Sequence, residues 1–229
     1  MGLKSFIIKI VIKRTFIYKN SLTIFFLLLF FATLWAQAHY GWLEYNEGLI
    51  RQSQIILTFP QYLSSGHFMS ATFENFESEF LQMGMYVIIT VYLRQIGSAE
   101  SKKIFHKSEV DREPKDHKNA PWPVKRGGFI LKLYSNSLFL CFAVLFIISW
   151  WLHFQGSWRD NNAELILQKL PTITKAEFLH QPRFWFETFQ NWQSEFLSVA
   201  AIVFLSIYLR QKGSPESKPV DAPHMETGK

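Results

Sequence analysis

The chain has 229 residues and a formal net charge of +6, with 23 Phe, 8 Trp and a single cysteine, Cys141. One cysteine excludes an intrachain disulfide and a paired-cysteine haem attachment, and no Gly-rich phosphate loop or nucleophile motif occurs. The apolar residues are bunched into four segments, a pattern typical of a membrane protein and not of a soluble domain.

Residues 1–19 alternate Lys with Ile, Val and Phe. This pattern predicts a basic amphipathic segment lying at the headgroup level of an anionic leaflet. From Ser21, an uncharged run of Phe and Leu predicts a first membrane span that reaches Trp42, because a crossing needs about 20 apolar residues. Ala36-Gln37-Ala38 also resembles a signal-peptidase site. Its counterpart Leu152-His153-Phe154 does not, so we expect the span to be retained.

A second span is expected from about Phe73 to Leu93, after an outer loop of aromatic residues. Thr72 is the predicted N-cap of this returning helix. The span reaches the required length only if Glu79 lies inside the helix, so the sequence predicts an ionisable residue near the hydrocarbon.

The second half of the chain repeats the first at a constant offset of 116 residues, as when Tyr92-Leu93-Arg94-Gln95 recurs as Tyr208-Leu209-Arg210-Gln211. A constant offset indicates a tandem duplication. The predicted organisation is a basic N-terminal segment over 1–19, a first two-helix membrane repeat over 20–102, a cytoplasmic linker over 103–132, a second two-helix membrane repeat over 133–218 and a disordered tail over 219–229. We expect the linker to be mobile, because it is polar and contains three prolines.

Both returning helices are followed by the same residues. Arg94 and Arg210 are predicted to anchor phosphate headgroups and to suit the helix dipole, and Gly97 and Gly213 are predicted helix terminators. The shared Gly-Ser-x-Glu-Ser-Lys continuation predicts a structured turn at the membrane surface. A docking site for a cytoplasmic partner is the alternative.

Nineteen of the 24 Lys and Arg residues lie before the first span, between the second and third, or after the fourth. Because basic residues are retained on the cytoplasmic side, both termini are predicted to be cytoplasmic, in a multi-pass protein of the inner membrane. The positive charge is therefore a signal of topology, and no nucleic-acid partner is expected. The predicted fold class is an all-α membrane protein with four transmembrane helices, arranged as two parallel helical-hairpin repeats. A soluble α-helical bundle is disfavoured by Trp residues near the ends of spans.

Polar side chains from all four spans are expected near the outer boundary. Glu79 and Glu195 are the leading candidates, because both copies keep the carboxylate. His153 comes second, because it can titrate or ligate a metal where the first copy has Gln37. The full candidate site for a proton, a metal ion or a polar headgroup is Glu79, Glu195, His153, Gln37, Gln82 and Ser198. The structural alternative is that the Glu residues pair with helix dipoles and His153 is an interfacial anchor. No catalytic residue and no cofactor is predicted.

Two motifs, Phe73-Glu-Asn-Phe-Glu-Ser-Glu-Phe-Leu-Gln82 and Tyr92-Leu-Arg-Gln-x-Gly-Ser-x-Glu-Ser-Lys102, together with Ser65-Gly66-His67-Phe68, resemble a family of bacterial integral membrane proteins defined by a domain of unknown function. The resemblance covers nearly the whole chain. It implies a bacterial inner-membrane protein and no particular activity. The second copy departs from the motifs at Arg183, in place of His67, and at Gln190, in place of Glu74.

The sequence favours a non-enzymatic scaffold or interaction protein in the lipid bilayer, as a homo-oligomer or with a membrane protein partner. The alternative is a small ion- or proton-coupled transporter or channel-like protein that uses Glu79 and Glu195.

Overall fold

The computed structural model describes residues 16–105 and 108–228, which are helical and contain no strand. The chain divides into two compact units, residues 1–68 and 69–229. The division falls inside helix α5 (Gly66–Tyr92), so most of the returning helix of the first predicted repeat is counted with the second unit. Residues 1–15 of the predicted amphipathic segment lie outside the described residues.

The first unit is built on one long helix. Helix α2 (Phe16–Lys19) leads into α3 (Ser21–Arg51), and α4 (Phe59–Leu63) follows after a loop. With 31 residues, α3 is about 46 Å long, and it continues past the expected end at Trp42. The loop returns onto α3 because the Asn46 side chain accepts a hydrogen bond from Leu57 N (2.8 Å) and donates one to Leu57 O (2.9 Å).

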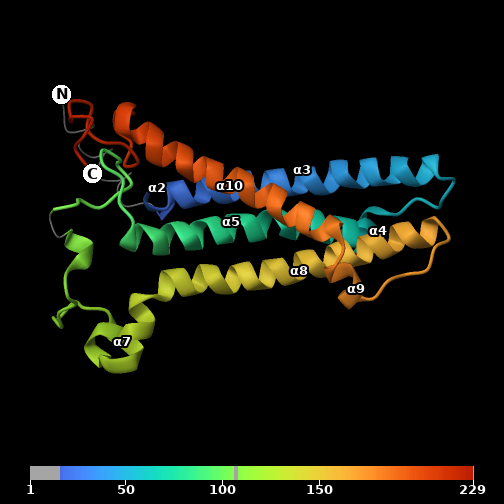
Figure 1. The fold of residues 1–229 in the computed structure, drawn as a ribbon, viewed down its shortest axis with the longest axis horizontal. Helices are drawn as coiled ribbons and strands as arrows, with labels where there is room; N and C mark the ends of the chain where they lie inside the picture. The colour runs from blue at the N-terminus through green and yellow to red at the C-terminus, as the bar shows by residue number, and fades with distance from the viewer. Residues whose placement is uncertain (1–15, 106–107, 229) are drawn as a thin grey trace. The chain divides into compact units, whose positions relative to one another are not determined.

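The second unit is a three-helix arrangement. Figure 1 shows α5 and α8 (Ser137–Leu167) running side by side, with α10 (Pro182–Tyr208) crossing them obliquely. The short helix α9 (Lys175–Leu179) lies between α8 and α10 in sequence. The predicted linker contains the 3₁₀ turn η1 (Glu109–Asp111), helix α6 (Trp122–Arg126) and the beginning of α7 (Gly128–Ser135), which continues past the predicted end of the linker at residue 132.

An aromatic core joins α8, α9 and α10. Phe154, Phe178 and Phe184 are buried, and Trp150 and Trp158 pack against them. The rings of Phe154 and Phe184 meet edge to face, with centroids 5.2 Å apart, a favoured geometry for aromatic pairs. This core holds the beginning of α10 against α8.

Two helices, α3 and α8, are long and apolar enough to cross a membrane. Only 6% and 17% of their apolar windows, respectively, is buried within the protein. Most of the apolar surface of these two windows is therefore exposed in the structure.

The local structures of the two halves follow the offset of 116 residues. The bounds of α3 and α8, of α4 and α9, and of α5 and α10 all differ by this number. The Asn162 side chain bonds Ile173 N (2.9 Å) and Ile173 O (3.0 Å), as Asn46 bonds Leu57. Corresponding residues therefore make corresponding contacts.

The returning helices begin six residues before their predicted caps. Helix α5 starts at Gly66 and α10 at Pro182, so Thr72 and Thr188 are buried within helices and the N-cap prediction is wrong. Ser65 Oγ accepts the Phe68 N–H (3.1 Å) at the start of α5. Pro182 occupies the first turn of α10, where its missing N–H costs nothing.

An arginine side chain caps the C-terminal end of α5 and of α10. Arg94 Nη1 donates to the carbonyls of Thr90, Val91 and Leu93 at 2.9–3.3 Å. Arg210 Nη1 donates to the equivalent carbonyls at 2.8–3.1 Å. These bonds satisfy carbonyls that have no partner inside the helix. Gly97 and Gly213 come five residues after the helix ends and form turns with φ of +82° and +86°, so they do not terminate the helices as predicted.

The shared Gly-Ser-x-Glu-Ser-Lys turns have the same internal hydrogen bonds. Ser101 Oγ accepts the Gln95 N–H, and Ser217 Oγ accepts the Gln211 N–H, both at 2.9 Å. Ser98 Oγ also accepts the Glu100 N–H (3.1 Å). The structured turn expected from the sequence is present in both halves.

Residues 219–228, predicted to be disordered, are bound to the first of these turns. Gly228 N donates to Ser98 O (3.0 Å), and Thr227 Oγ1 accepts the Gly97 N–H (2.9 Å). The buried ammonium group of Lys218 donates to four backbone carbonyls at 2.6–3.2 Å, those of Gly97, Pro223, His224 and Glu226. The backbone of the described part of this segment therefore has specific partners, and its predicted disorder stays a prediction.

Candidate functional site

A stripe of polar residues runs along one face of α8. His153, Ser157 and Asp160 are buried, and Glu164 continues the stripe. Their spacings of four, three and four residues bring them to the same side of the helix. On α10, Arg183, Glu187 and Asn191 are each four residues apart and face this stripe, as their contacts show. The second unit therefore holds a cluster of ionisable groups among α5, α8 and α10.

His153 lies at the centre of the cluster, between two carboxylates. Its Nδ1 atom is 3.1 Å from Glu77 Oε2, and its Nε2 atom is 3.5 Å from Glu187 Oε2. The side chains of His153 and Glu77 are both completely buried. Nε2 lies within ion-pair distance of Glu187 without the alignment of a hydrogen bond. Only the protonated imidazolium presents N–H groups to both carboxylates.

Arg183 binds three carboxylates at the start of α10. Its Nη2 donates to Asp160 (2.8 Å), its Nη1 to Glu164 (2.7 Å) and its Nε to Glu187 (2.9 Å). Ser157 Oγ donates to the second oxygen of Glu187 (2.6 Å). Glu187 thus connects Arg183 to His153.

Helix α5 supplies the opposite wall. Trp192 Nε1 donates to Glu77 Oε1 (3.3 Å), so both oxygens of Glu77 have partners. Glu74, one turn earlier, accepts a short hydrogen bond from Asn191 Nδ2. Gly156 allows α8 to approach closely here, because a Cβ at this position would lie 2.8 Å from Ser70 Cα.

Acidic side chains outnumber basic ones in this cluster. Its five carboxyl groups, those of Glu74, Glu77, Asp160, Glu164 and Glu187, lie with only two basic groups, those of Arg183 and His153. Exposure rises in steps from His153 at 0% through Glu187 at 20% and Arg183 at 34% to Glu164 at 51%. The buried imidazole is therefore linked to the surface by a chain of ion pairs, through Glu187 and Arg183 to Glu164.

Five of the six predicted site residues are divided between two places in the second unit, and the sixth, Gln37, belongs to the first unit. His153 lies in the buried cluster. Gln82 instead donates to Ser198 Oγ (2.6 Å) and to Glu195 O (3.0 Å), where α5 and α10 meet. Glu79 is exposed and Glu195 is half-buried, and an ion-binding role for this pair stays a prediction. Gln37 is half-buried on α3, in the first unit.

Sequence reasoning missed Glu77 and Glu187, which bind His153. It favoured carboxylates present in both copies, whereas Gln193 and Ala71 stand at the positions equivalent to these two. The signal that could have found the site is helical spacing. Charged and polar residues recur at intervals of three or four along otherwise apolar helices, as on α8.

The first unit has different polar chemistry at matching positions. Tyr62 Oη lies 3.1 Å from His67 Nδ1, and the ring of Tyr45 packs against both. In the second copy, Phe178 and Arg183 replace Tyr62 and His67. Gly41 leaves the space that the Tyr62 hydroxyl fills.

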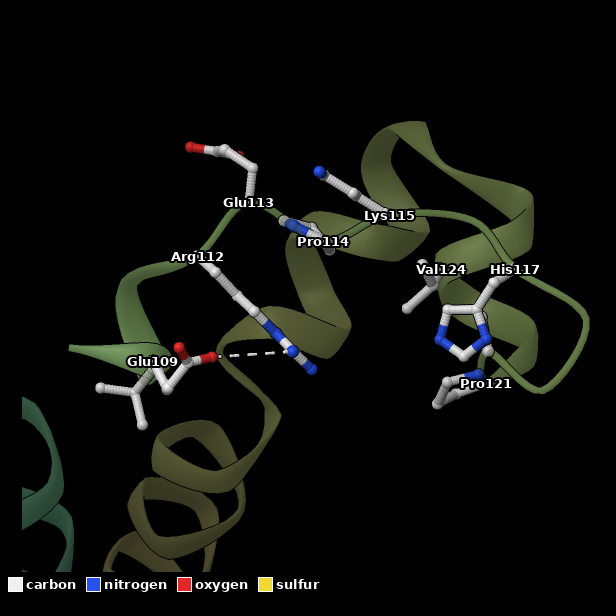
Figure 2. Close-up of a pocket in the computed structure, with 10 residues that line it drawn as sticks. Glu109, Arg112, Glu113, Pro114, Lys115, His117, Pro121 and Val124 are labelled. Atoms are coloured by element: carbon white, nitrogen blue, oxygen red, sulfur yellow. Dashed lines mark ion pairs between the residues drawn. The ribbon is translucent and has the colours of Figure 1, made fainter. Parts of the chain in front are cut away.

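A hollow of the described residues lies elsewhere. It has a volume of about 920 Å³ and is lined by residues of the linker, including Glu109, Arg112, His117 and Val124. Figure 2 shows the Arg112–Glu109 ion pair on one side and His117, Pro121 and Val124 gathered on the other. None of these residues belongs to the His153 cluster. No group of three or more His, Cys, Asp or Glu side chains in the described ranges is arranged to hold a metal ion.

The fold and the site define an all-helical protein with two helices that could cross a membrane and a buried histidine–carboxylate cluster. The chain belongs to the family described as Domain of unknown function (DUF6766), which matches residues 13–229. No curated protein and no solved structure matches the chain.

Proposed function

We propose that this chain is a non-enzymatic, proton-coupled transporter or channel-like protein of a bacterial inner membrane, with the proton bound at His153. One observation carries the proposal: both ring nitrogens of a completely buried histidine face carboxylates. Protonation of this imidazole creates two favourable ion pairs, and its loss leaves an acceptor nitrogen facing an anion. The proton is therefore bound by a defined set of groups.

The membrane topology is part of the proposal. Helices α3 and α8 have the length and exposed apolar surface of spans, and α5 and α10, at 27 residues each, are about 40 Å long. We infer four spans in two hairpin repeats, with both termini cytoplasmic, from the distribution of Lys and Arg. His153 lies sixteen residues into α8, about 24 Å from its start. This depth lies toward the outer side in the proposed topology.

A purely structural role for this cluster, as in a scaffold protein, is the weaker hypothesis. Burying ions is costly, and a buried ion pair is often no more stable than well-packed apolar residues. Ionisable residues inside a membrane bundle are therefore retained chiefly where they bind or move charge. A homo-oligomer or a membrane protein partner stays a prediction from the sequence.

Proton flux in proteoliposomes tests the proposal. The purified protein is reconstituted with a trapped pH-sensitive dye, and a membrane potential is imposed with potassium and valinomycin. The wild type should acidify the lumen faster than protein-free liposomes. His153→Gln and Glu77→Gln should reduce this flux to the protein-free rate, whereas His180→Gln, which changes an exposed histidine, should leave it unchanged.

Two results would count against the proposal. A wild-type rate equal to that of empty liposomes removes proton movement altogether. The second result is a His153→Gln variant that keeps full flux while a Glu79→Gln, Glu195→Gln double variant loses it. This result would show that the proton binds at the pair predicted from the sequence and not at His153. Thermal unfolding of every variant distinguishes lost function from lost folding.

A further inference from the structure

The connecting segment 117–135 carries only positive charge. It contains Lys118, Lys125, Arg126 and Lys132, and no Asp or Glu occurs between Asp116 and Asp160. The side chains of Lys125, Arg126 and Lys132 are exposed. Such a concentration of cations immediately before a span is attracted to the anionic lipids of a cytoplasmic leaflet.

The same segment exposes large apolar side chains. Trp122 on α6, and Phe129 and Leu133 on α7, are 65%, 78% and 51% exposed, respectively. Phe129 and Leu133 are four residues apart and share one face of α7. Lys132 lies beside that face, where its long stem can cover apolar surface while its ammonium group reaches the headgroups.

Helix α7 lies between a sharp turn and a short break that leads into α8. Gly127 and Gly128 have φ of +68° and +57°, which turns the chain sharply between α6 and α7. Helix α7 ends at Ser135, and only Asn136 separates it from the start of α8 at Ser137. At this break Asn136 Nδ2 donates to Lys132 O (2.8 Å), and Ser137 Oγ donates to Tyr134 O (2.7 Å). Two backbone carbonyls at the break between α7 and α8 thus accept hydrogen bonds from side chains.

The first unit has the same arrangement before its own long helix. Asn20 Nδ2 donates to Phe16 O (2.8 Å) between α2 and α3, and Phe16, Ile17 and Tyr18 are all exposed. Two helical breaks at equivalent positions therefore carry exposed apolar residues next to lysine.

We infer that α6 and α7 dock on the anionic lipid surface of the cytoplasmic leaflet, with α7 lying in the headgroup region before α8 enters the hydrocarbon. This inference rests on the proposed membrane insertion of α8. The occupant is a lipid surface because α7 is followed directly in the chain by the candidate span, and because every charged side chain of segment 117–135 is positive. A protein partner would not require that continuity.

Spin labels on the full chain test this docking. Cys141→Ser removes the single native thiol, and single cysteines are then introduced as Leu133→Cys on α7, Val144→Cys on α8 and Lys212→Cys after α10. Each labelled protein is reconstituted in vesicles of phosphatidylcholine with phosphatidylglycerol. Collisions with oxygen and with a water-soluble nickel complex report the depth of the label.

The label at 133 should collide with the nickel complex several-fold less than the label at 212, and should be shallower than the label at 144. Replacing Lys125, Arg126 and Lys132 by Gln should return position 133 to water. Replacing Lys103, Lys115 and Lys212 by Gln removes the same charge elsewhere and should leave the depth of the label at 133 unchanged. A water-exposed label at 133 with a buried label at 144 overturns this inference alone. Water exposure at both positions overturns the proposed membrane span as well.

Discussion

At the scale of single residues, Gly156 sets how closely α8 approaches α5. The backbone of Met69 and Ser70 occupies the space that a side chain at this position would need. Because His153 and Ser157 lie within one turn of Gly156, this close approach also brings the imidazole to Glu77. The site therefore depends on a residue that has no polar side chain.

Gly156→Ala should destabilise the protein, since the added methyl group meets backbone that cannot rotate away. The expected loss is about 1–3 kcal/mol, the usual cost of overpacking. Gly48→Ala is the matched control, because nothing lies within 4 Å of that position on α3, and it should leave stability unchanged or raise it slightly. Thermal unfolding in detergent measures both. Equal melting temperatures for the two variants would contradict the close approach of α5 and α8.

The residues of the site could be predicted only in part. His153 was identified because it replaces Gln37 in the other copy. Its partners Glu77 and Glu187 lie on two other helices, at separations of 76 and 34 residues, and their approach is fixed by packing at Gly156 and the aromatic core. Local sequence does not carry that information.

At the scale of elements, composition predicted where the helices are and local capping decided where they end. The apolar run of α3 ends near Trp42, but the helix continues to Arg51 because the next residues include good helix formers such as Leu43, Glu44 and Glu47. Ser53, with φ of +56°, follows just after its end. Helix bounds thus depend on backbone partners that hydropathy does not reveal.

The capping boxes of α4 and α9 provide a pH comparison within one chain. Hydrogen bonds from Thr174 N (2.7 Å) and Thr174 Oγ1 (2.8 Å) hold the pKa of Glu177 below its ordinary value of 4.5. Since the folded-state pKa is lowered, this stabilisation is present above the ordinary pKa and is lost as the pH falls through the folded one. The equivalent box at Thr58 uses Gln61, which does not titrate.

The backbone amide of Thr174 should therefore shift during an acid titration followed by NMR, with a midpoint below the ordinary value for Glu. The amide of Thr58 should stay constant over the same range. A Thr174 midpoint at the ordinary Glu value would show that the capping hydrogen bonds are absent in solution.

At the scale of the whole molecule, the repeat predicted the order and offset of the long helices. It did not predict the contacts of residues 219–228, whose polar, proline-containing sequence is typical of disorder. Lys218 contributes to these contacts, and its ammonium group also reaches the carbonyl of Gly97, 121 residues earlier. The equivalent Lys102 pairs instead with Asp111 at 2.6 Å, so identical motifs acquire different partners from their surroundings.

Lys218→Met should release this segment, because four carbonyls would lose a charged donor and each such bond contributes roughly 1.5–3 kcal/mol. Amide hydrogen exchange, read by mass spectrometry, should become faster in peptides covering 97–102 and 219–228. Lys212→Met changes an exposed lysine and should leave both peptides protected. Unchanged exchange in Lys218→Met would show that the hydrogen bonds from Lys218 to the four carbonyls do not protect the segment.

The hydrogen bond between Lys218 and Gly97 also has a consequence for the order of events during synthesis. Its carbonyl at Gly97 is translated 121 residues before the lysine that binds it. At roughly 5–20 residues per second, the turn after α5 waits about 6–24 s for its partner. For most of that interval Ser98 also lacks Ser206, which is translated 108 residues after it and whose hydroxyl lies 3.0 Å from its own in the folded protein. The turn after α5 thus leaves the ribosome without these partners, which are supplied only when the end of α10 and Lys218 have been made.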